Sequence, residues 1–398
     1  MPSVTMFGIY YAPDRSGNAP YTTGTAEFLA ANGWDVTMVT GMPHYPEWKK
    51  RRAPAQSIIN GVRIIRANHY VPSNPTTLGR GAMEVTWTMG AWRPLLSRLN
   101  TDVVVGITPT LAAAWLAAAT AKRSHSPLVL WFQDLMGQAA VQSGIDGADR
   151  IAGAVKRIEH RLALGADQIV MCADGYQSYF EEADIPPERL SVVRNWSTMP
   201  KPTKTRSETL AQHGLSEAAV VALHSGNMGA KQGLDVVLDA AENRSEVTWV
   251  LQGDGSERRS LEASAKERGL TNVVFLPSLE SEDLSSLLSA ADVLLLTQLP
   301  AVTDMSLPSK LTSYLTSGTP VVAAVHPDSE AALLLREAGS AQITAAGDGA
   351  ALASAVTSAI GCSAPMVNSA DLFGSPEKIE KVLLQAIEAR TRQPGLVG

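Results

Sequence analysis

Residues 220–252, VVALHSGNMGAKQGLDVVLDAAENRSEVTWVLQ, decide the fold class. The apolar runs Val220–His224 and Val247–Leu251 predict two buried strands, and the amphipathic pattern Leu234–Glu242 between them predicts a helix. Strands that read as continuous apolar runs are buried on both faces, and a helix that joins two of them makes the pair parallel. The stretch therefore predicts one β-α-β unit of a parallel sheet.

The same alternation runs along most of the chain and predicts two series of strands. The expected strands of the first series are Val4–Ile9, Asp35–Val39, Gly61–Arg66, Asp102–Gly106, Pro127–Trp131, Gln168–Met171 and Leu190–Val193. The second series continues from the opening stretch with Val273–Leu276, Val293–Leu296, Val321–Ala324 and Ala341–Ile343. Helical patterns lie between most of these runs, as a doubly wound sheet requires.

A break at Ser197–Lys204, STMPKPTK, reads as a linker between the two series. We therefore expect an α/β fold of two Rossmann-like, doubly wound parallel-sheet domains over residues 1–197 and 198–375. The last helix, Pro376–Arg392 within residues 376–398, is long enough to pack back on the first domain. Open α/β sheets bind ligands at the carboxyl ends of their strands, so we expect a ligand cleft between the two domains.

Composition narrows the class of protein. The chain has 398 residues, 45% of them hydrophobic and 18% charged, and a net charge of −6, which gives no attraction to nucleic acid. Cys172 and Cys362 are too few and too far apart for a disulfide framework or a zinc site. No signal peptide is recognisable, and the longest apolar run, Leu111–Ala119, is about half the ~20 residues of a membrane span. We expect a cytoplasmic protein that is not integral to a membrane.

Several catalytic and nucleotide-binding motifs are absent from the sequence. It contains no P-loop, nucleophile elbow, HExxH or CxxC, and Arg258 stands where the third glycine of a dinucleotide fingerprint belongs. No Asp-x-Asp pair occurs, so we expect no metal site. A diphosphate would then need helix N-termini and basic side chains.

The segment Ser225–Gly233, SGNMGAKQG, follows the first strand of the second series and offers such groups. Its glycines let the backbone approach a ligand closely, and Lys231 lies just before a helix N-terminus, which suits an anion. An ordinary strand–helix turn with a surface lysine explains the segment equally well.

A second candidate is Leu307-Pro308-Ser309-Lys310. Proline fits the first turn of a helix, so Ser309 and Lys310 would present free N–H groups and one ammonium to a leaving diphosphate. A helix cap with a solvated lysine is the simpler reading of this segment alone. Together with the Lys231 segment, the anion-site reading is favoured.

These segments occur in an order that resembles the retaining GT-B glycosyltransferases of glycosyltransferase family 4. The second half carries SGNMGAKQGLDVVLDAAE, WVLQGDGSERRSLEA, NVVFLPSLESEDLSSLLSAADVLLL and SLPSKLTSYLTSGTPVVAA, and the first half carries YYAPDRSGNAPYTTGTAEFLAANGWDVTMVTGMPHYPEW, WFQDLMGQAAVQSG and VVRNWS. The nearest resemblance is to colanic-acid, O-antigen and capsule enzymes, N-acetylfucosamine transferases among them. The resemblance spans nearly the whole chain.

The resemblance implies a nucleotide-sugar donor in the second domain and an acceptor in the first. It implies that Lys231, with Asn227 beside it, contacts the donor diphosphate, and that Ser309 and Lys310 bind it from the later helix. Gly17, in the loop Ser16-Gly17-Asn18, would close over the diphosphate from the first domain.

For the rest of the donor, the resemblance implies that Gly253 and Asp254 line the nucleoside pocket and that Leu279 packs near the base. Glu330, at the start of the helix after HPDS, would accept hydrogen bonds from ribose or sugar hydroxyls. A UDP-sugar is the first expectation for the donor and a GDP-sugar the second.

The chain departs from the family pattern in three places. The family carries two glutamates eight positions apart before a G-x-P turn, and counting back from Gly318 finds Met305 and Ser313 there instead. The arginine of the phosphate loop is missing, with Asn227 near its place, and Gly137 stands where a proline is expected. These departures leave the donor sugar and the level of activity open.

In the first domain, Asp134 is the best candidate for a base or a carboxylate that orients a sugar, because it follows the apolar run Leu128–Phe132 at the expected edge of the sheet. A helix N-cap at Asp134 is an equally good reading. His44 either touches the acceptor or, more simply, is a structural loop residue. His224 lies in a buried strand and reads as a core histidine.

Residues 79–98, GRGAMEVTWTMGAWRPLLSR, mix apolar and basic side chains. Trp87, Trp92, Leu95 and Leu96 together with Arg93, Arg98 and the run Lys49–Arg52 would suit an anionic membrane surface, where a polyprenyl-linked acceptor resides. A core helix beside a solvated charge run is the alternative.

We therefore expect a metal-independent glycosyltransferase of the hexosyl or N-acetylhexosaminyl type, acting in bacterial polysaccharide or cell-envelope biosynthesis. Its partners would be the nucleotide-sugar donor, a glycan or polyprenyl-linked acceptor and the inner face of the cell membrane, with no nucleic acid. Two other functions remain open. One is a non-catalytic nucleotide-sugar-binding homologue, motivated by the missing glutamates, and the other is a non-hydrolysing sugar-nucleotide epimerase.

Overall fold

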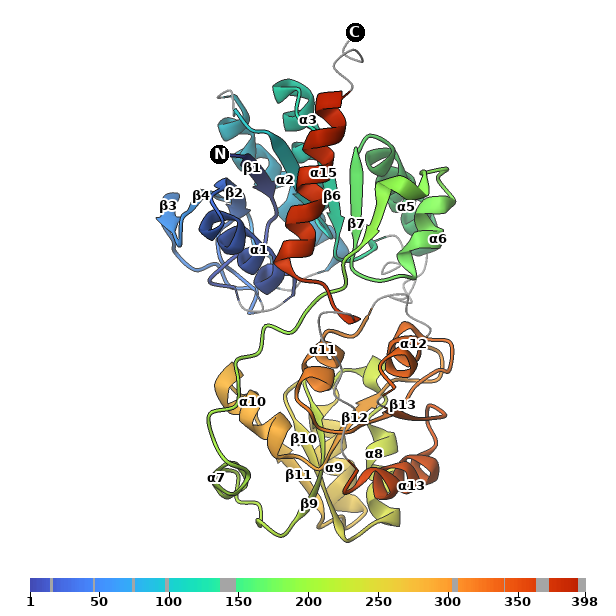
Figure 1. Ribbon diagram of the computed structural model, residues 1–398. Coiled ribbons are helices and arrows are strands. Elements are labelled where there is room, and N and C mark those ends of the chain that lie inside the picture. Colours follow the sequence, from blue (N-terminus) through green and yellow to red (C-terminus); the bar gives the residue numbers. More distant parts are fainter. Residues whose placement is uncertain are drawn as a thin grey trace. The chain divides into compact units, whose positions relative to one another are not determined.

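A computed structural model describes residues 1–14, 17–45, 47–73, 76–96, 100–136, 148–302, 307–339, 341–362 and 372–392. The chain forms two compact units (Figure 1). Unit 1 runs to Arg194 and resumes at Gly374, and unit 2 comprises Asn195–Phe373. Each unit is described by itself below.

Unit 1 is built on an eight-stranded sheet with the order β3-β4-β2-β1-β5-β6-β7-β8. Every neighbouring pair is parallel except β3 and β4. The strands are β1 Ser3–Phe7, β2 Asp35–Gly41, β3 Gln56–Ile59, β4 Val62–Ala67, β5 Val103–Ile107, β6 Leu128–Phe132, β7 Gln168–Met171 and β8 Leu190–Val192. The expected strands are therefore present, with ends shifted by one or two residues.

The strand β3 was not predicted, because it lies at the edge of the sheet and its residues are mostly exposed. It pairs with β4 across Asn60 and Gly61, which have φ angles of 49° and 81°. An Asn-Gly pair with two positive φ angles is the preferred two-residue hairpin turn. That dipeptide was the available signal, and it shows that Gly61 belongs to a turn and not to the following strand.

Helices cover both faces of this sheet, as the doubly wound pattern predicts (Figure 1). The C-terminal helix α15 lies against α1 and the strands β5, β6 and β7. Its Glu380 Oε1 accepts a hydrogen bond of 2.8 Å from Trp34 Nε1. The helices are α1 Ala19–Ala31, α2 Thr77–Leu96, α3 Leu111–Ser124, α5 Ala148–Leu164, α6 Tyr176–Glu181, the 3-10 turn η1 Pro187–Arg189 and α15 Pro376–Arg392.

Unit 2 is built on a six-stranded sheet with the order β11-β10-β9-β12-β13-β14, in which all pairs are parallel. The strands are β9 Val220–Ser225, β10 Val247–Gln252, β11 Val273–Leu276, β12 Val293–Thr297, β13 Val321–Ala324 and β14 Ala341–Thr344. The helical segments are α7 Arg206–Gln212, the 3-10 turn η2 Ala230–Gln232, α8 Asp235–Asn243, α9 Arg258–Glu267, α10 Ser281–Ala290, α11 Ser309–Thr316, α12 Glu330–Glu337 and α13 Gly349–Ala359.

The helix α7 was also not predicted, although its start carries a recognisable signal. Thr205 Oγ1 accepts from Glu208 N–H at 3.3 Å, and Glu208 accepts from Thr205 N–H at 2.9 Å. This capping box is readable in the sequence as T-x-x-E.

Alternate residues of the central strands of unit 2 enter two separate apolar cores. Val221 and Leu223 of β9 belong to one core, whereas Ala222 belongs to the other, together with the fully buried Trp249 of β10. Burial on both faces is why these strands read as continuous apolar runs. The prediction of two doubly wound α/β domains is thus confirmed.

Each sheet has one point where the chain changes direction across it. In unit 2 the chain proceeds from β9 outward to β10 and β11, and then returns to the other side of β9 with β12, β13 and β14. In unit 1 the corresponding point lies between β1 and β5. Such switch points open a crevice at the carboxyl ends of the strands, where α/β proteins bind ligands.

Candidate functional site

At the switch point of unit 2, two loops approach each other backbone to backbone. Gly226, directly after β9, has a φ of 121°, and Gly253, directly after β10, has a φ of 131°. A Cβ on Gly253 would lie 1.9 Å from the carbonyl oxygen of Gly226. Only glycine therefore fits at position 253, both for conformation and for space.

Hydrogen bonds hold these two loops together. Gly226 N–H donates to Gln252 O at 2.9 Å, and Met228 N–H donates to Asp254 O at 2.8 Å. Gly255 repeats the close approach, because a Cβ there would lie 2.4 Å from Met228 O. The result is a floor of peptide groups at the edge of the sheet, to which Gly226 and Gly253 contribute no side chain of their own.

The side chain of Lys310, at the second residue of α11, extends over this floor. A Cβ on Gly226 would lie 3.5 Å from Lys310 Nζ, and that ammonium lies 3.3 Å from Nε2 of His224 on β9. One turn later, Tyr314 Oη accepts a hydrogen bond of 2.7 Å from Ser225 N–H. These contacts fix the start of α11 against the end of β9.

Burial lowers the pKa of Lys310 to about 7. Within the described part of the chain, no carboxylate forms an ion pair with this lysine. Burial and the neighbouring Lys310 also hold the pKa of His224 well below its ordinary value. A desolvated ammonium without a counter-charge favours an incoming anion, because the anion stabilises its charged form.

Lys231 and Asn227 lie in the same loop as Gly226. Lys231 is exposed within the 3-10 turn η2, which ends shortly before α8, as the sequence predicts. Its carbonyl accepts a hydrogen bond of 2.9 Å from Leu299 N–H, which joins this loop to the segment after β12. The side chain of Asn227 lies against Gly229: a Cβ added to Gly229 would be 2.8 Å from Asn227 Nδ2.

The remaining candidates of unit 2 follow neighbouring strands at the same carboxyl edge. Leu279 comes after β11, is half-buried and packs on a core cluster. Ser309 is the exposed first residue of α11. Glu330 is the first residue of α12, behind the N-cap Ser329, whose Oγ accepts from Ala332 N–H at 3.2 Å. The fold therefore places all these residues along one edge, and the contacts given above join Lys310, Gly226, His224 and the two loops.

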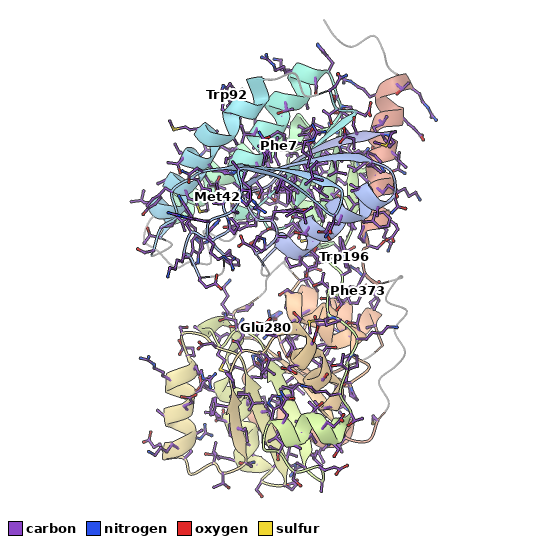
Figure 2. The ribbon with its side chains drawn as sticks, turned by 90° about the vertical axis from the view of Figure 1, so that its left-hand side faces the viewer. Phe7, Met42, Trp92, Trp196, Glu280 and Phe373 are labelled. Atoms are coloured by element: carbon purple, nitrogen blue, oxygen red, sulfur yellow. The ribbon has the colours of Figure 1, made fainter. Side chains whose placement is uncertain are left out.

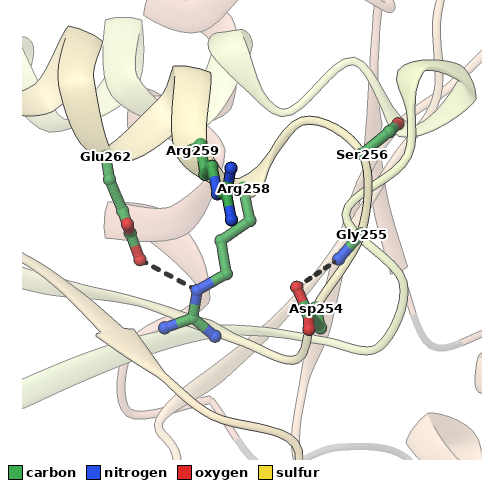
Figure 3. Close-up of a pocket in the computed structure, with 6 residues that line it drawn as sticks. All are labelled: Asp254, Gly255, Ser256, Arg258, Arg259 and Glu262. Atoms are coloured by element: carbon green, nitrogen blue, oxygen red, sulfur yellow. Dashed lines mark hydrogen bonds and ion pairs between the residues drawn. The ribbon is translucent and has the colours of Figure 1, made fainter.

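A pocket of about 500 Å³ lies beside this edge, at the start of α9 (Figure 3). Arg258 crosses it, since its Nε donates to Glu262 at 2.8 Å and its Nη1 donates to Leu276 O at 3.0 Å and Gly253 O at 2.5 Å. Arg258 thus links the ends of β10 and β11 by hydrogen bonds. This role explains why an arginine stands where a dinucleotide fingerprint has its third glycine. The lining residues are Asp254, Gly255, Ser256, Arg258, Arg259 and Glu262.

In unit 1, Asp134 follows β6 as predicted. Its Oδ1 accepts from Leu135 N–H at 2.9 Å, and its carbonyl accepts from Thr108 Oγ1 at 3.2 Å. Asn18 Nδ2 in turn donates to Thr108 O at 3.0 Å. Gly17 is exposed, has a φ of 66° and lies against the Tyr45 ring. Asp134 and Gly17 therefore belong to loops at the switch point of this sheet.

The structural interpretation of His44 is confirmed. The residue is fully buried, its Nδ1 lies 2.8 Å from Met42 O and its N–H donates to Asp14 Oδ1 at 3.1 Å. The buried Asp14 also pairs with Arg51 at 2.6 Å. The basic run 49–52 is thus partly structural, which the sequence pattern did not reveal.

The expected apolar surface of α2 exists and includes the predicted Trp92, but Leu78, Val85 and Met89 were not predicted. Trp87 is fully buried and is a core residue, which corrects the prediction for it. Trp92, at the outside of unit 1 in Figure 2, is 43% exposed and stacks on the 46% exposed Trp115 of α3, with ring centroids 5.5 Å apart. Arg98, Gly137 and position 305 lie outside the described residues, as do the side chains of Arg93, Leu95 and Leu96.

Within the described residues, no helix is both long and apolar enough to cross a membrane. Nor do those residues contain a group of three or more histidine, cysteine, aspartate or glutamate side chains arranged to hold a metal ion.

Comparison with known families assigns both units. The family model "Glycosyl transferase 4-like domain" matches residues 16–196, and "Glycosyl transferases group 1" matches residues 205–371. The putative colanic acid biosynthesis glycosyl transferase WcaI of Escherichia coli is 29% identical over 336 residues, covering 79% of this chain and 81% of that protein.

Solved structures share the fold at low sequence identity. Sucrose-phosphate synthase from Thermosynechococcus elongatus superposes with a TM-score of 0.70 at 17% identity, covering 99% of this chain and 98% of that one. HepE from Anabaena, in complex with UDP-glucose, gives a TM-score of 0.67 at 17% identity, covering 98% of this chain and 99% of its own. With both halves matched in order, the chain belongs to the GT-B glycosyltransferases that join a glycosyl transferase 4-like domain to a group 1 domain.

Proposed function

We propose that the protein transfers a sugar, with retention and without a metal, from a nucleoside diphosphate-sugar to a glycan acceptor in bacterial envelope polysaccharide synthesis. The observation that carries this proposal is the desolvated Lys310 ammonium above the glycine floor at the switch point of unit 2, which has no carboxylate partner among the described residues. The similarity to WcaI supports a role in polysaccharide synthesis, and the UDP-glucose complex of HepE makes a UDP-sugar the first donor to test, with a GDP-sugar the second.

In this mechanism the donor diphosphate lies over Gly226 and Gly253. As the bond to the sugar breaks, the leaving phosphate gains negative charge, which Lys310, Lys231 and the N–H groups at the start of α11 stabilise. Asn227 contributes a neutral hydrogen-bond donor where relatives carry a cation. The leaving phosphate accepts the proton of the acceptor hydroxyl, so the reaction needs no nucleophilic side chain.

The other predicted residues receive roles in the same proposal. Asp254 and Leu279 border the nucleoside, and Glu330 accepts hydrogen bonds from ribose or sugar hydroxyls. In unit 1, Asp134 orients the acceptor and Gly17 lets its loop approach the substrates.

A donor screen followed by a transfer assay tests the proposal. UDP-, GDP- and dTDP-sugars are first compared by thermal shift, and the donor that stabilises the protein most is then supplied with polyprenyl-linked acceptors. We expect a glycosylated product with the donor's anomeric configuration, formed at an unchanged rate in EDTA. A donor that is only hydrolysed, or a product of inverted configuration, would contradict the proposal.

One observation favours a non-catalytic alternative. Ser313 lies on α11 at a position where the family carries a glutamate, and Met305 occupies the other. A protein that binds the donor tightly yet produces neither transfer nor hydrolysis would fit this alternative. Conversion of the donor to its epimer would instead indicate the epimerase reading.

For the acceptor side, we propose a polyprenyl-linked glycan presented at the inner face of the cell membrane, with unit 1 docking there. Leu78, Val85, Met89 and Trp92 are spaced to share one face of α2, and each is at least 43% exposed. On α3, Lys122 follows Trp115 by seven residues, so both residues lie on the same face of the helix. Lys122 adds positive charge beside the apolar side chains. This combination suits anionic lipid headgroups.

Co-sedimentation with phosphatidylglycerol vesicles tests the docking face. The Val85→Ser/Met89→Ser variant is expected to lose most of the binding, while Leu333→Ser, which removes a 51% exposed leucine from unit 2, leaves it unchanged. Equal binding by both variants, or no binding by the wild-type protein, would contradict membrane docking by this face.

A further inference from the structure

The side chain of His224 lies directly beneath the ammonium of Lys310. His224 is fully buried on β9, and its Nε2 is 3.3 Å from Lys310 Nζ. Its Nδ1 makes no hydrogen bond of good geometry to the described residues, and the backbone groups of Asn227 and Leu295 beside the ring offset part of the lowering of its pKa. Packing alone does not require an imidazole here, because an apolar side chain on this strand would avoid burying two ring nitrogens.

Hydrogen-bond chemistry fixes the roles of the two groups. An ammonium has three donors and no acceptor, so Nε2 accepts when Lys310 is charged, and the ring proton then resides on Nδ1. A protonated imidazole would place a second buried cation beside the first. His224 therefore works as a neutral acceptor, in agreement with its pKa well below the ordinary value.

Among the residues that the structure describes, few titratable groups face this pair. On α11, Tyr314 has its hydroxyl bonded to Ser225 N–H and its pKa raised by burial, so it stays neutral. From β9 only His224 faces Lys310, and the adjoining loop presents Gly226. The charge of Lys310 therefore depends on its acceptor beneath and on whatever binds over Gly226.

We propose that His224 is a positioning residue: as a neutral acceptor it aims the Lys310 ammonium across Gly226, and binding of a nucleoside diphosphate draws one proton from solvent onto Lys310. The inference rests on the proposed function, since it takes the diphosphate to be the ligand. The proton passes from the buffer to the lysine amine, and no other bond changes. With a free-protein pKa of about 7, Lys310 is mostly neutral at pH 8 and mostly charged at pH 6.

Calorimetry at pH 8 in two buffers of different ionisation enthalpy measures this uptake, with UDP, GDP, dTDP and inorganic pyrophosphate as probes. At that pH the terminal phosphates of the nucleoside diphosphates carry almost no proton to exchange, whereas inorganic pyrophosphate keeps one, so proton uptake by Lys310 is read from UDP, GDP and dTDP and pyrophosphate serves to compare affinity. Wild-type protein is expected to take up about 0.9 proton per bound ligand. Lys310→Met is expected to take up none.

Variants of His224 test the positioning role. His224→Leu removes the acceptor, so the affinity for the best probe should fall about tenfold at pH 8 and less than about threefold at pH 6. His224→Gln keeps an acceptor and should restore the wild-type profile. Val221→Ala, a buried change on the same strand, should alter affinity by the same factor at both pH values.

A second measurement needs no ligand. In protein labelled with ¹⁵N-lysine, the NMR titration of Lys310 should show a lower pKa in His224→Leu than in the wild-type protein. An unchanged titration, ligand binding without proton uptake at pH 8, or an equal loss of affinity at pH 6 and pH 8 would each overturn the inference. If the probes bind and take up a proton while no sugar is transferred, the proposed function fails and this inference stands.

Discussion

The switch points of the two sheets differ in whether their charged side chains have partners within the protein. In unit 1 the buried or half-buried charged groups have protein partners: Arg51 pairs with Asp14, Arg66 donates to the carbonyls of Ala12 and Gly41, and Glu84 accepts from Ala112 N–H. In unit 2 the desolvated Lys310 ammonium extends over the backbone of Gly226, and among the described residues its side-chain partner is the neutral imidazole of His224. A sheet edge whose charged groups all have protein partners offers a ligand only a shaped surface. A sheet edge with one uncompensated ammonium also attracts an anion.

The largest expected effect comes from filling the glycine floor. Gly253→Ala would place a Cβ against the Gly226 carbonyl at a φ of 131°, so we expect a loss of about 3 kcal/mol or more in the free energy of unfolding and no donor binding. Gly269→Ala is the matched control, because its φ is 68° and its Cβ would meet nothing within 4 Å. It should cost about 1–2 kcal/mol and leave donor binding intact. Chemical denaturation and donor titration measure both, and equal effects would contradict the account.

Replacing one cation at the sheet edge of each unit should separate effects on donor affinity from effects on the stability of the fold. Lys310→Met is expected to weaken donor binding about 10- to 100-fold with little effect on folding, because it deletes a charge-assisted contact. Arg51→Met leaves the buried Asp14 without its partner, so it should lower stability and spare donor affinity. Calorimetry and thermal unfolding of both variants check this. Equal weakening of donor binding by Arg51→Met and Lys310→Met would show that the two sheet edges do not differ in this way.

In unit 1, the buried carboxyl of Glu84 should make the stability of the fold depend on pH. Burial raises the pKa of Glu84 from 4.5 to about 7, so the folded state binds more protons than the unfolded state between those values. Stability attributable to Glu84 is therefore lost as the pH rises from 4.5 to 7. Glu84→Gln, which keeps an acceptor for Ala112 N–H, should be about 2 kcal/mol more stable than wild type at pH 8 and nearly equal at pH 4. Denaturation at the two pH values checks it, and a gain of equal size at both would refute the assignment.

The smallest expected effect concerns Lys231, which is exposed, unlike Lys310. An exposed cation is hydrated and screened, so Lys231→Ala should weaken donor binding only about 3- to 10-fold, and less at high salt. A titration at two ionic strengths measures it. An unchanged affinity would remove Lys231 from the diphosphate site.

Sequence patterns predicted the fold because burial on both faces leaves a continuous apolar run, as in β9 and β13. They missed β3 and α7, whose signals are local turn and capping chemistry instead of apolar periodicity. For the proposed site, Gly226 and Gly253 were readable from their places after strands, and Lys310 from its place at the start of a helix. The partnership of Lys310 with His224 was not, because 86 residues separate them and only the adjacency of β9 and α11 joins them. The burial of Trp87 was likewise invisible, since Trp87 and Trp92 differ only in which face of α2 they occupy.

Hydrogen–deuterium exchange with and without the nucleoside diphosphate that binds best shows which loops the ligand covers. We expect the strongest protection at residues 226–233, at residues 253–257 and at the start of α11, and loss of that protection in Lys310→Met. Protection confined to unit 1, or protection in unit 2 that Lys310→Met leaves unchanged, would contradict the assignment of the donor diphosphate to this edge.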